Sequence, residues 1–116
     1  MFSVYVYPYT SYPSMHDLTA FQRDLMFVIS GLDEPKGLDI KEIVNSYYWE
    51  DIRHGRLYPN LDALVEKGLV EKGQHDQRTN KYVLTEYGKR EIEARVQWQF
   101  RMLSDEIKED LNIVVS

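Results

Sequence analysis

Apolar residues recur with a helical period in three segments of the first two thirds of the chain. The first segment begins near Thr19, which stands three residues before Gln22 as in a capping box. Its apolar stripe consists of Leu18, Phe21, Leu25, Val28, Ile29 and Leu32. This pattern predicts a first helix that ends near Gly31.

Two further segments keep the helical period. Asp39 can cap a second helix that turns four apolar residues inward: Ile40, Ile43, Val44 and Tyr47. A third helix is expected from about Gly55 to Lys67, with Gly68 as its C-terminal stop. The residues expected to be buried on it are Leu57, Leu61, Leu64 and Val65. Three consecutive short helices are therefore predicted.

After Gly68 the period of the apolar residues changes from the helical value to that of a strand. Leu69 and Val70 lead one strand, and residues 82–84 form its return strand. The residues between them, 73–81, are too hydrophilic to be buried. Helices followed by a two-stranded ribbon with a charged tip predict a winged helix-turn-helix.

The C-terminal segment is predicted to form a single long helix. Thr85 can cap it, Glu86 favours its first turn, and the pattern extends to about Ile113. Its apolar residues recur at spacings of three and four: Ile92, Val96, Phe100, Leu103, Ile107, Leu111 and Val114. Because a small domain cannot cover such a stripe, a partner helix from a second copy of the chain is expected. The alternative is a helix that folds back on its own core.

Together these elements predict an α+β fold, mostly α, with a winged helix-turn-helix at residues 17–85 and a long C-terminal dimerisation helix at 86–116. In residues 1–16, apolar residues alternate with tyrosines until two prolines interrupt the run. This aromatic segment can be an edge strand, a peripheral arm, or an extension before a start at Met15. We expect a peripheral arm.

Charge favours a nucleic-acid partner for only part of the chain, whose net charge is −5. Between Arg53 and Lys81, six basic residues accompany four acidic ones, so this segment carries +2 and the rest of the chain −7. A weakly basic segment on an acidic body is compatible with a DNA-binding face in a salt-rich cytoplasm. An ordinary acidic surface explains the charge equally well.

Composition and spacing exclude several other classes. The absence of cysteine excludes disulfides, thiolate metal sites and thiol redox chemistry, and indicates a cytoplasmic protein. No apolar run is long enough to span a membrane, and the N-terminus does not resemble a signal peptide. The histidines (His16, His54 and His75) lack the spacing of zinc ligands, and no acid–base pair or phosphate loop is recognisable. We therefore expect no enzyme, no cofactor and no metal.

The start of the third helix carries the side chains best suited to reading DNA. These residues are Arg53, His54, Arg56, Tyr58 and Asn60. Arg can bind O6 and N7 of guanine together, and Asn can bind N6 and N7 of adenine. Backbone amides at a helix start can also hold a phosphate. The alternative is that this helix start is simply solvated and binds no ligand. The hairpin that follows the helix argues against that alternative.

The hairpin supplies a second set of candidate DNA contacts, consisting of Arg78, Asn80 and Lys81. An Arg at such a tip can enter a narrow minor groove or bind a phosphate. Lys41, early in the second helix, could position the DNA backbone or pair with a neighbouring carboxylate. The aromatic run at residues 47–49 is expected to fill the core or a dimer seam, with a ligand pocket as the alternative.

The third helix and the hairpin resemble the PadR family of transcriptional regulators. The run GRLYPNLDALVEKGLVEK is similar to the family pattern G-x-L-Y-P-x-L-x-x-L-x-x-x-G-L-I/V. The run RTNKYVLTEYGKREIEA is similar to the pattern R-x-K-x-Y-x-L-T-x-x-G-x-x-x-L. The resemblance covers about residues 17–103. Within the family, the chain resembles more narrowly the haloarchaeal branch, which includes the reactive oxygen species regulator.

The resemblance implies a homodimer held together by the first and the last helix. The residues it places at that interface are Phe21, Ile92, Val96, Phe100, Leu103 and Ile107. It also implies that Tyr58 enters the major groove while Arg78 and Lys81 touch the DNA backbone or minor groove. Some relatives bind aromatic small molecules at the dimer centre, which would make Trp98 a lining residue for an effector. The aromatic arm has no counterpart in the family.

The sequence therefore predicts a dimeric winged-helix transcription factor that binds double-stranded DNA at a two-fold symmetric operator. Its half-sites should lie about one helical turn apart, or a multiple of that distance. Two alternatives share the fold. One is a protein-interaction module that never binds DNA, and the other is a regulator gated by a small molecule at the dimer seam.

Overall fold

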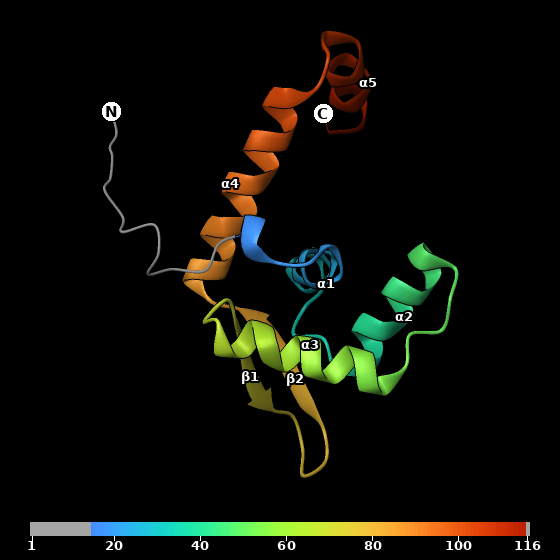
Figure 1. Ribbon diagram of the computed structural model, residues 1–116, viewed down its shortest axis with the longest axis vertical. Coiled ribbons are helices and arrows are strands. Elements are labelled where there is room, and N and C mark those ends of the chain that lie inside the picture. Colours follow the sequence, from blue (N-terminus) through green and yellow to red (C-terminus); the bar gives the residue numbers. More distant parts are fainter. Residues whose placement is uncertain (1–14, 116) are drawn as a thin grey trace.

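The computed structural model describes residues 15–115, which form five α-helices and a two-stranded hairpin that projects from one end of the molecule (Figure 1). The elements follow in the order η1 (Met15–Asp17), α1 (Ala20–Gly31), α2 (Gly37–Tyr48), α3 (His54–Glu66), β1 (Val70–Gln74), β2 (Asn80–Leu84), α4 (Glu86–Met102) and α5 (Asp105–Val115). The aromatic arm predicted at 1–16 lies outside the described residues except at its end. There Met15 is buried, and its backbone N–H donates to Glu91 Oε1 at 3.2 Å.

Helix α1 begins with the capping box that the sequence predicts. The Thr19 hydroxyl accepts from the Gln22 N–H at 3.1 Å, and Gln22 Oε1 accepts from the Thr19 N–H at 3.2 Å. These two bonds satisfy amides that a helix start otherwise leaves unpaired. The buried face of α1 then supplies the centre of the core through Leu25, Met26 and Ile29.

Helix α2 begins three residues earlier than predicted, with Lys36 rather than Asp39 in the capping position. Asp39 lies in the first turn, where its carboxylate accepts from the Lys36 N–H at 2.8 Å. Ile40 and Val44 are buried, whereas Ile43 and Tyr47, which were also expected to face inward, are exposed. The prediction was wrong there because only a narrow face of α2 meets the core.

Helix α3 and its end agree with the sequence prediction. Leu57, Leu61 and Leu64 are buried, and Val65 is half-buried beside them. Gly68 has φ of 77° and follows the last turn; its N–H donates to Val65 O, and the Leu69 N–H donates to Leu64 O. This pair of bonds is a Schellman motif, which favours glycine because the left-handed backbone strains other residues.

The hairpin is the predicted antiparallel pair, with Val70 opposite Leu84 and Gln74 opposite Asn80. The strands extend further into the polar segment than expected, and the turn is reduced to residues 75–79. The segment before α2 pairs with the outer side of β2, since the Tyr82 N–H donates to Pro35 O at 2.9 Å. The hairpin is thereby tied to the connection between α1 and α2.

The C-terminal segment is two helices rather than the single helix predicted. Thr85 caps α4 as expected, accepting from the Gly88 N–H at 2.9 Å. Leu103 is extended (φ −74°, ψ 152°), and Ser104 begins α5 by accepting from the Ile107 N–H at 3.3 Å. Ser104 with Asp105 and Glu106 is a helix-start signal that competes with the continuous apolar period. Among the helices of residues 15–115, none is long and apolar enough to cross a membrane.

Candidate nucleic-acid interface

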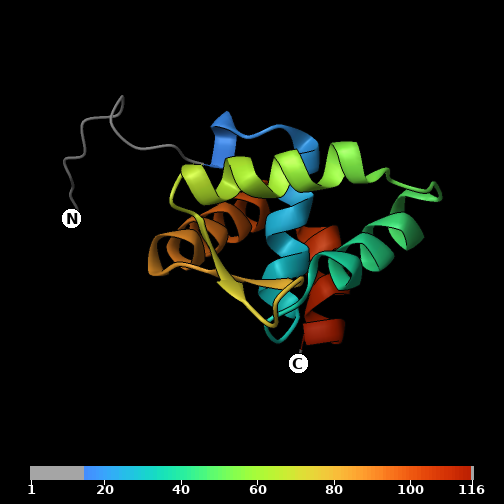
Figure 2. The same cartoon turned by 90° about the horizontal axis from the view of Figure 1, so that it is seen from below.

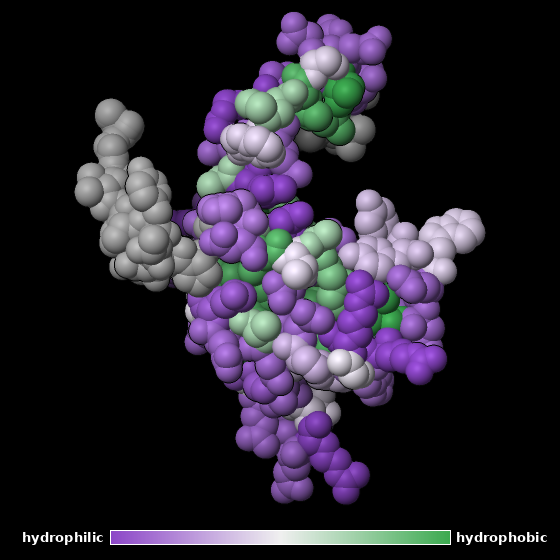
Figure 3. Space-filling view, viewed as in Figure 1, coloured by the Kyte–Doolittle hydropathy of each residue, from purple (hydrophilic) through white to green (hydrophobic). Residues whose placement is uncertain are grey.

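Helix α3 and the hairpin lie at the end of the molecule opposite α5 (Figure 1). Seen from below, α3 runs across the molecule with the hairpin beside it (Figure 2). The surface over this end is mainly hydrophilic, whereas hydrophobic residues gather on the C-terminal helices (Figure 3). The two sets of candidate DNA contacts therefore share one end of the fold.

The turn between α2 and α3 determines where the polar start of α3 lies. Asn45 accepts from the Ile52 N–H at 2.7 Å and donates to Asp51 Oδ1 at 3.2 Å, while Ile52 is buried. Arg53 then takes the N-cap position without a side-chain capping bond, so the first amides of α3 have no side-chain acceptor. Arg53 and His54 are both exposed there.

Arg56 is the most firmly placed cation at this helix start. Its guanidinium carbon lies 4.1 Å from the centre of the Phe21 ring, and Nη1 lies 3.8 Å from Glu50 Oε1. Phe21 itself is only 6% exposed and belongs to the core of its own subunit. Arg56 and Tyr48, whose ring centre lies 6.0 Å away, already cover much of the Phe21 ring, and its place in a dimer interface stays a prediction.

Tyr58 packs against the start of α2 rather than pointing freely outward. A Cβ atom at Gly37 would lie 2.6 Å from the Tyr58 hydroxyl oxygen, so the ring rests directly on this glycine. His54 meets the Tyr58 ring edge-on at a centroid distance of 5.4 Å. Tyr58 is half-buried and holds α2 and α3 together, with only part of its ring left for a ligand.

Asn60 is used inside the fold. Its Oδ1 accepts from Gln22 Nε2 at 3.0 Å, and its Nδ2 donates to Arg56 O at 2.7 Å. Gln22 also belongs to the capping box of α1, so one network joins the start of α1 to the middle of α3. Both ends of the Asn60 amide therefore already have partners within the fold, and none is left for a base.

The hairpin tip presents Arg78 and Asn80 to solvent. The Arg78 N–H donates to Asp76 Oδ1 at 2.9 Å, and this bond lowers the pKa of the Asp76 carboxyl below its ordinary value. Within residues 15–115, the Arg78 side chain has no ion pair. Lys81, in contrast, donates to Glu34 Oε1 at 2.5 Å, which lowers the pKa of Glu34.

Lys41 also has an acidic partner. Its Nζ lies 3.1 Å from Asp51 Oδ1, and this hydrogen bond lowers the pKa of the Asp51 carboxyl. Thus Lys41, Arg56 and Lys81 each face a carboxylate. The sequence could not reveal Glu34 as a partner, because 47 residues separate it from Lys81. Only the structure distinguishes Glu34, whose backbone φ of 46° is unusual for a residue other than glycine.

The remaining residues predicted for a dimer interface divide into two groups. Ile92 is half-buried and packs on the core of its own chain, so only part of its side chain is left for the predicted interface. Val96, Phe100 and Ile107 are exposed, and Leu103 is half-buried at the break between α4 and α5. Trp98, Met102 and Leu111 enlarge this exposed apolar surface.

The aromatic run at residues 47–49 does not fill the core as a unit. Tyr48 donates to Asp24 Oδ2 at 2.5 Å, and burial followed by this bond raises the pKa of Tyr48 to about 12. Tyr47 is 77% exposed and Trp49 is 92% exposed, so these two residues do not fill the core, and their place in a dimer seam stays a prediction. Trp49 has φ of 60° because it ends α2 in the left-handed region.

Comparison with known proteins identifies the family. The model of the PadR-like family of transcriptional regulators matches residues 26–94. The chain belongs to the PadR-like family of transcriptional regulators. This result confirms the family resemblance seen in the sequence motifs. No curated protein matches the chain.

Solved structures place this PadR-like chain near a haloarchaeal relative. The structure of RosR from Halobacterium salinarum, grown from NaBr, has a sequence 42% identical to this chain and a TM-score of 0.79. The match covers 85% of this chain and 91% of RosR. The complex hsRosR-SG is 41% identical, with 89% and 93% covered at a TM-score of 0.81. MarR is only 17% identical in sequence, and the match covers 85% of this chain and 74% of the MarR chain. Its TM-score of 0.59 shows that it shares the winged-helix fold.

The motif shared with the PadR family has a packing explanation in the Leu-Thr-x-x-Gly segment. The Thr85 hydroxyl donates to Gly68 O at 2.7 Å while it caps α4. A Cβ atom at Gly88 would lie only 2.1 Å from Leu69 O. These residues join α4 to the hairpin and to the end of α3, so the motif maintains the position of the hairpin.

Proposed function

We propose that this PadR-like protein is a transcriptional regulator that binds a pseudo-palindromic DNA operator as a homodimer. The observation that carries the proposal is the exposed cationic start of α3 at the same end as the hairpin tip, in a fold shared with RosR. A helix with this placement can enter the major groove, and a basic hairpin tip can reach the flanking backbone. The protein would act on cellular DNA in the cytoplasm.

Five residues are proposed to make the principal contacts. Arg53, His54 and Arg56 would face base edges or phosphates from α3, while Arg78 and Asn80 would contact the minor groove or the backbone. Lys41, Tyr58 and Lys81 are secondary candidates. Lys41 and Lys81 are held by carboxylates at 3.1 and 2.5 Å and Tyr58 packs on Gly37, whereas the ion pair of Arg56 with Glu50 is longer, at 3.8 Å. An exposed ion pair contributes only about 0–1 kcal/mol, so a phosphate can replace a carboxylate at little cost.

The proposed dimer would use the exposed apolar residues of α4 and α5. Val96, Phe100 and Ile107 lie on helices at the end of the molecule away from α3. A second copy that covers these residues leaves both recognition helices exposed. A two-fold symmetric protein then binds most tightly to a two-fold symmetric site.

The acidic residues near the proposed interface favour binding in concentrated salt. Glu34, Glu50 and Asp51 lie beside cations of this face, which weakens its attraction for a polyanion at low salt. In molar salt the gain from counterion release is small, so base contacts and DNA shape must supply more of the affinity. Such a balance suits a protein related to a haloarchaeal regulator.

Two substitutions test the assignment of the face. Arg56→Ala and Arg78→Ala should each weaken binding to a selected operator by roughly tenfold or more at matched salt. Arg90→Ala, which removes an exposed cation from α4, is the matched control and should have no effect. Unchanged affinity in both test variants would show that the DNA-binding face lies elsewhere.

A further inference from the structure

Gly55, in the first turn of α3, is not required by the packing of the fold. A Cβ atom there would meet nothing within 4 Å, whereas a Cβ at Gly37 or Gly88 would collide with a neighbour. Its φ lies outside the left-handed region, unlike that of Gly68. Because glycine within a helix is destabilising relative to alanine, folding alone does not explain a glycine at this exposed position.

Pro59 follows one helical turn later and is a second residue that disfavours the helix. It is exposed, so no buried contact compensates for it. Gly55 and Pro59 lie on the same side of α3, opposite to its three buried leucines. Proline has no N–H, so the ordinary helical bond from residue 59 to the Gly55 carbonyl cannot form.

The Gly55 carbonyl is therefore an acceptor that lacks its helical donor, in a residue that has no side chain. The next carbonyl along the helix, that of Arg56, instead accepts from Asn60 Nδ2 at 2.7 Å. Carbonyls on the solvent side of a helix tilt outward. A partner that approaches α3 from outside can thus reach the Gly55 oxygen without meeting a Cβ atom.

We propose that the Gly55 carbonyl reads one base in the major groove by accepting a hydrogen bond from its exocyclic amino group. In that groove adenine N6 and cytosine N4 donate, whereas thymine O4 and guanine O6 accept. A carbonyl therefore favours adenine or cytosine at one position of the contacted strand and disfavours guanine and thymine. This inference rests on the proposed function, since it requires α3 to lie in the major groove.

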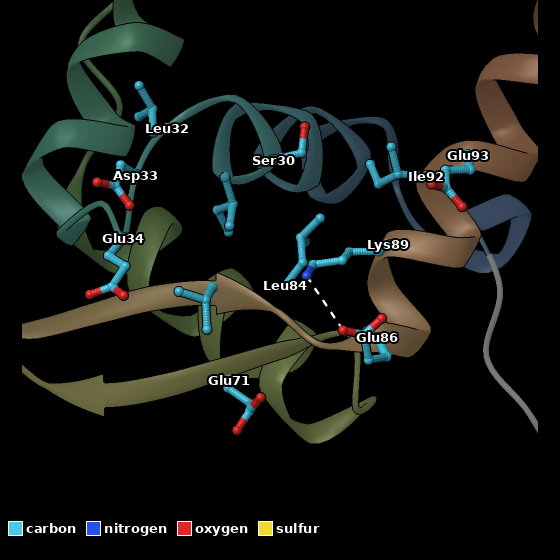
Figure 4. A pocket seen from close by; sticks show the side chains of 12 residues that line it. Ser30, Leu32, Asp33, Glu34, Glu71, Leu84, Glu86, Lys89, Ile92 and Glu93 are labelled. Atoms are coloured by element: carbon cyan, nitrogen blue, oxygen red, sulfur yellow. Dashed lines mark hydrogen bonds and ion pairs between the residues drawn. The ribbon is translucent and has the colours of Figure 1, made fainter.

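The charges around α3 are compatible with this approach. Further along the exposed face, Asp62 is paired with Lys72 of β1 at 2.9 Å, and Glu66 stands at the opposite end of the helix. The hollow between α1, the hairpin and α4 is lined instead by five carboxylates and one cation (Figure 4). Phosphates would be repelled from that hollow, so the duplex is expected on the α3 side.

The variant Pro59→Ala tests the proposal, because it restores the N–H that bonds the Gly55 carbonyl within the helix. It should melt at a higher temperature than the wild type, since a helix-breaking residue is removed. In selection from a random duplex library, its preference for adenine or cytosine at one position of each half-site should fall roughly threefold to tenfold. An unchanged preference or an unchanged melting temperature would overturn the proposal.

An ester at the same position separates the carbonyl from the proline ring. L-Lactic acid in place of Pro59 carries the methyl group of alanine but no N–H, so it should keep the preference of the wild type. A loss equal to that in Pro59→Ala would assign the effect to the proline ring and overturn the proposal.

Gly55→Ala places a methyl group on the contacting face and should weaken binding to the selected operator about tenfold. Gly31→Ala is the matched control, because its Cβ also meets nothing within 4 Å but lies at the end of α1, and it should bind as the wild type does. Equal affinities of the two variants would contradict a close approach at Gly55. A wild type that enriches no motif would contradict the proposed function itself, and this inference with it.

Discussion

At the scale of single residues, Gly88 lets the start of α4 lie directly against the backbone of Leu69, just beyond α3. A methyl group there would lie 2.1 Å from Leu69 O, a backbone atom that cannot move alone. We expect Gly88→Ala to lower the free energy of unfolding by about 1–3 kcal/mol through overpacking. Gly31→Ala is the control, because a Cβ at Gly31 meets nothing within 4 Å. Urea denaturation that gave the same stability for both variants would contradict this explanation.

A second residue-scale prediction concerns Tyr48 and its bond to Asp24. Removal of the hydroxyl in Tyr48→Phe should cost about 1–2 kcal/mol, because Asp24 loses its partner in a half-buried position. The pKa of Tyr48 is raised from 10.0 to about 12, so the neutral form favours folding. Its contribution is complete below pH 10 and is lost as the pH rises through 12.

Alkaline denaturation tests whether ionisation of Tyr48 lowers the free energy of unfolding. The variant Tyr48→Phe should lose less stability than the wild type between pH 10 and 12. Tyr47→Phe provides the control, since its side chain is 77% exposed and makes no hydrogen bond within residues 15–115. Identical pH dependence in wild type and Tyr48→Phe would show that the bond to Asp24 does not act in solution.

At the scale of elements, the break between α4 and α5 depends on Ser104. Its hydroxyl accepts from the Ile107 N–H, so Ser104→Ala should destabilise the start of α5 by about 1 kcal/mol. Hydrogen exchange at Ile107 and Lys108 should become faster, while exchange in α3 stays constant. Ser46→Ala, at an exposed position inside α2, should leave exchange in α5 unchanged. Slower exchange in Ser104→Ala would indicate one continuous helix instead.

Local sequence signals predicted the elements better than the contacts between them. Thr19, Gly68 and Thr85 identified helix ends correctly because each acts through a neighbouring backbone group. The break at Ser104 was missed because the apolar period continues across it. Asn60 was assigned to the DNA interface from its chemistry and Phe21 to the dimer interface from the family resemblance. Their observed partners, Gln22 and Arg56, come from other helices. Such pairings depend on tertiary packing, which a single sequence does not specify.

At the scale of the whole molecule, the exposed apolar residues of α4 and α5 predict a stable dimer. A charge placed in the seam by Phe100→Glu or Ile107→Glu should give monomers, because it would have to be buried without a partner. Gln97→Glu adds the same charge at an exposed polar position and should leave the dimer intact. Analytical ultracentrifugation distinguishes these cases. A monomeric wild-type protein, or dimers in both seam variants, would contradict the proposed interface.

Selection of bound sequences from a random duplex library tests the central claim most directly. The purified protein would be used in molar KCl and again at low salt, since its acidic surface makes the affinity depend on ionic strength. We predict enrichment of a palindromic motif whose half-sites lie about one helical turn apart or a multiple of that. A library that stays unenriched at both salt concentrations would contradict the assignment of this PadR-like chain as a sequence-specific DNA-binding regulator.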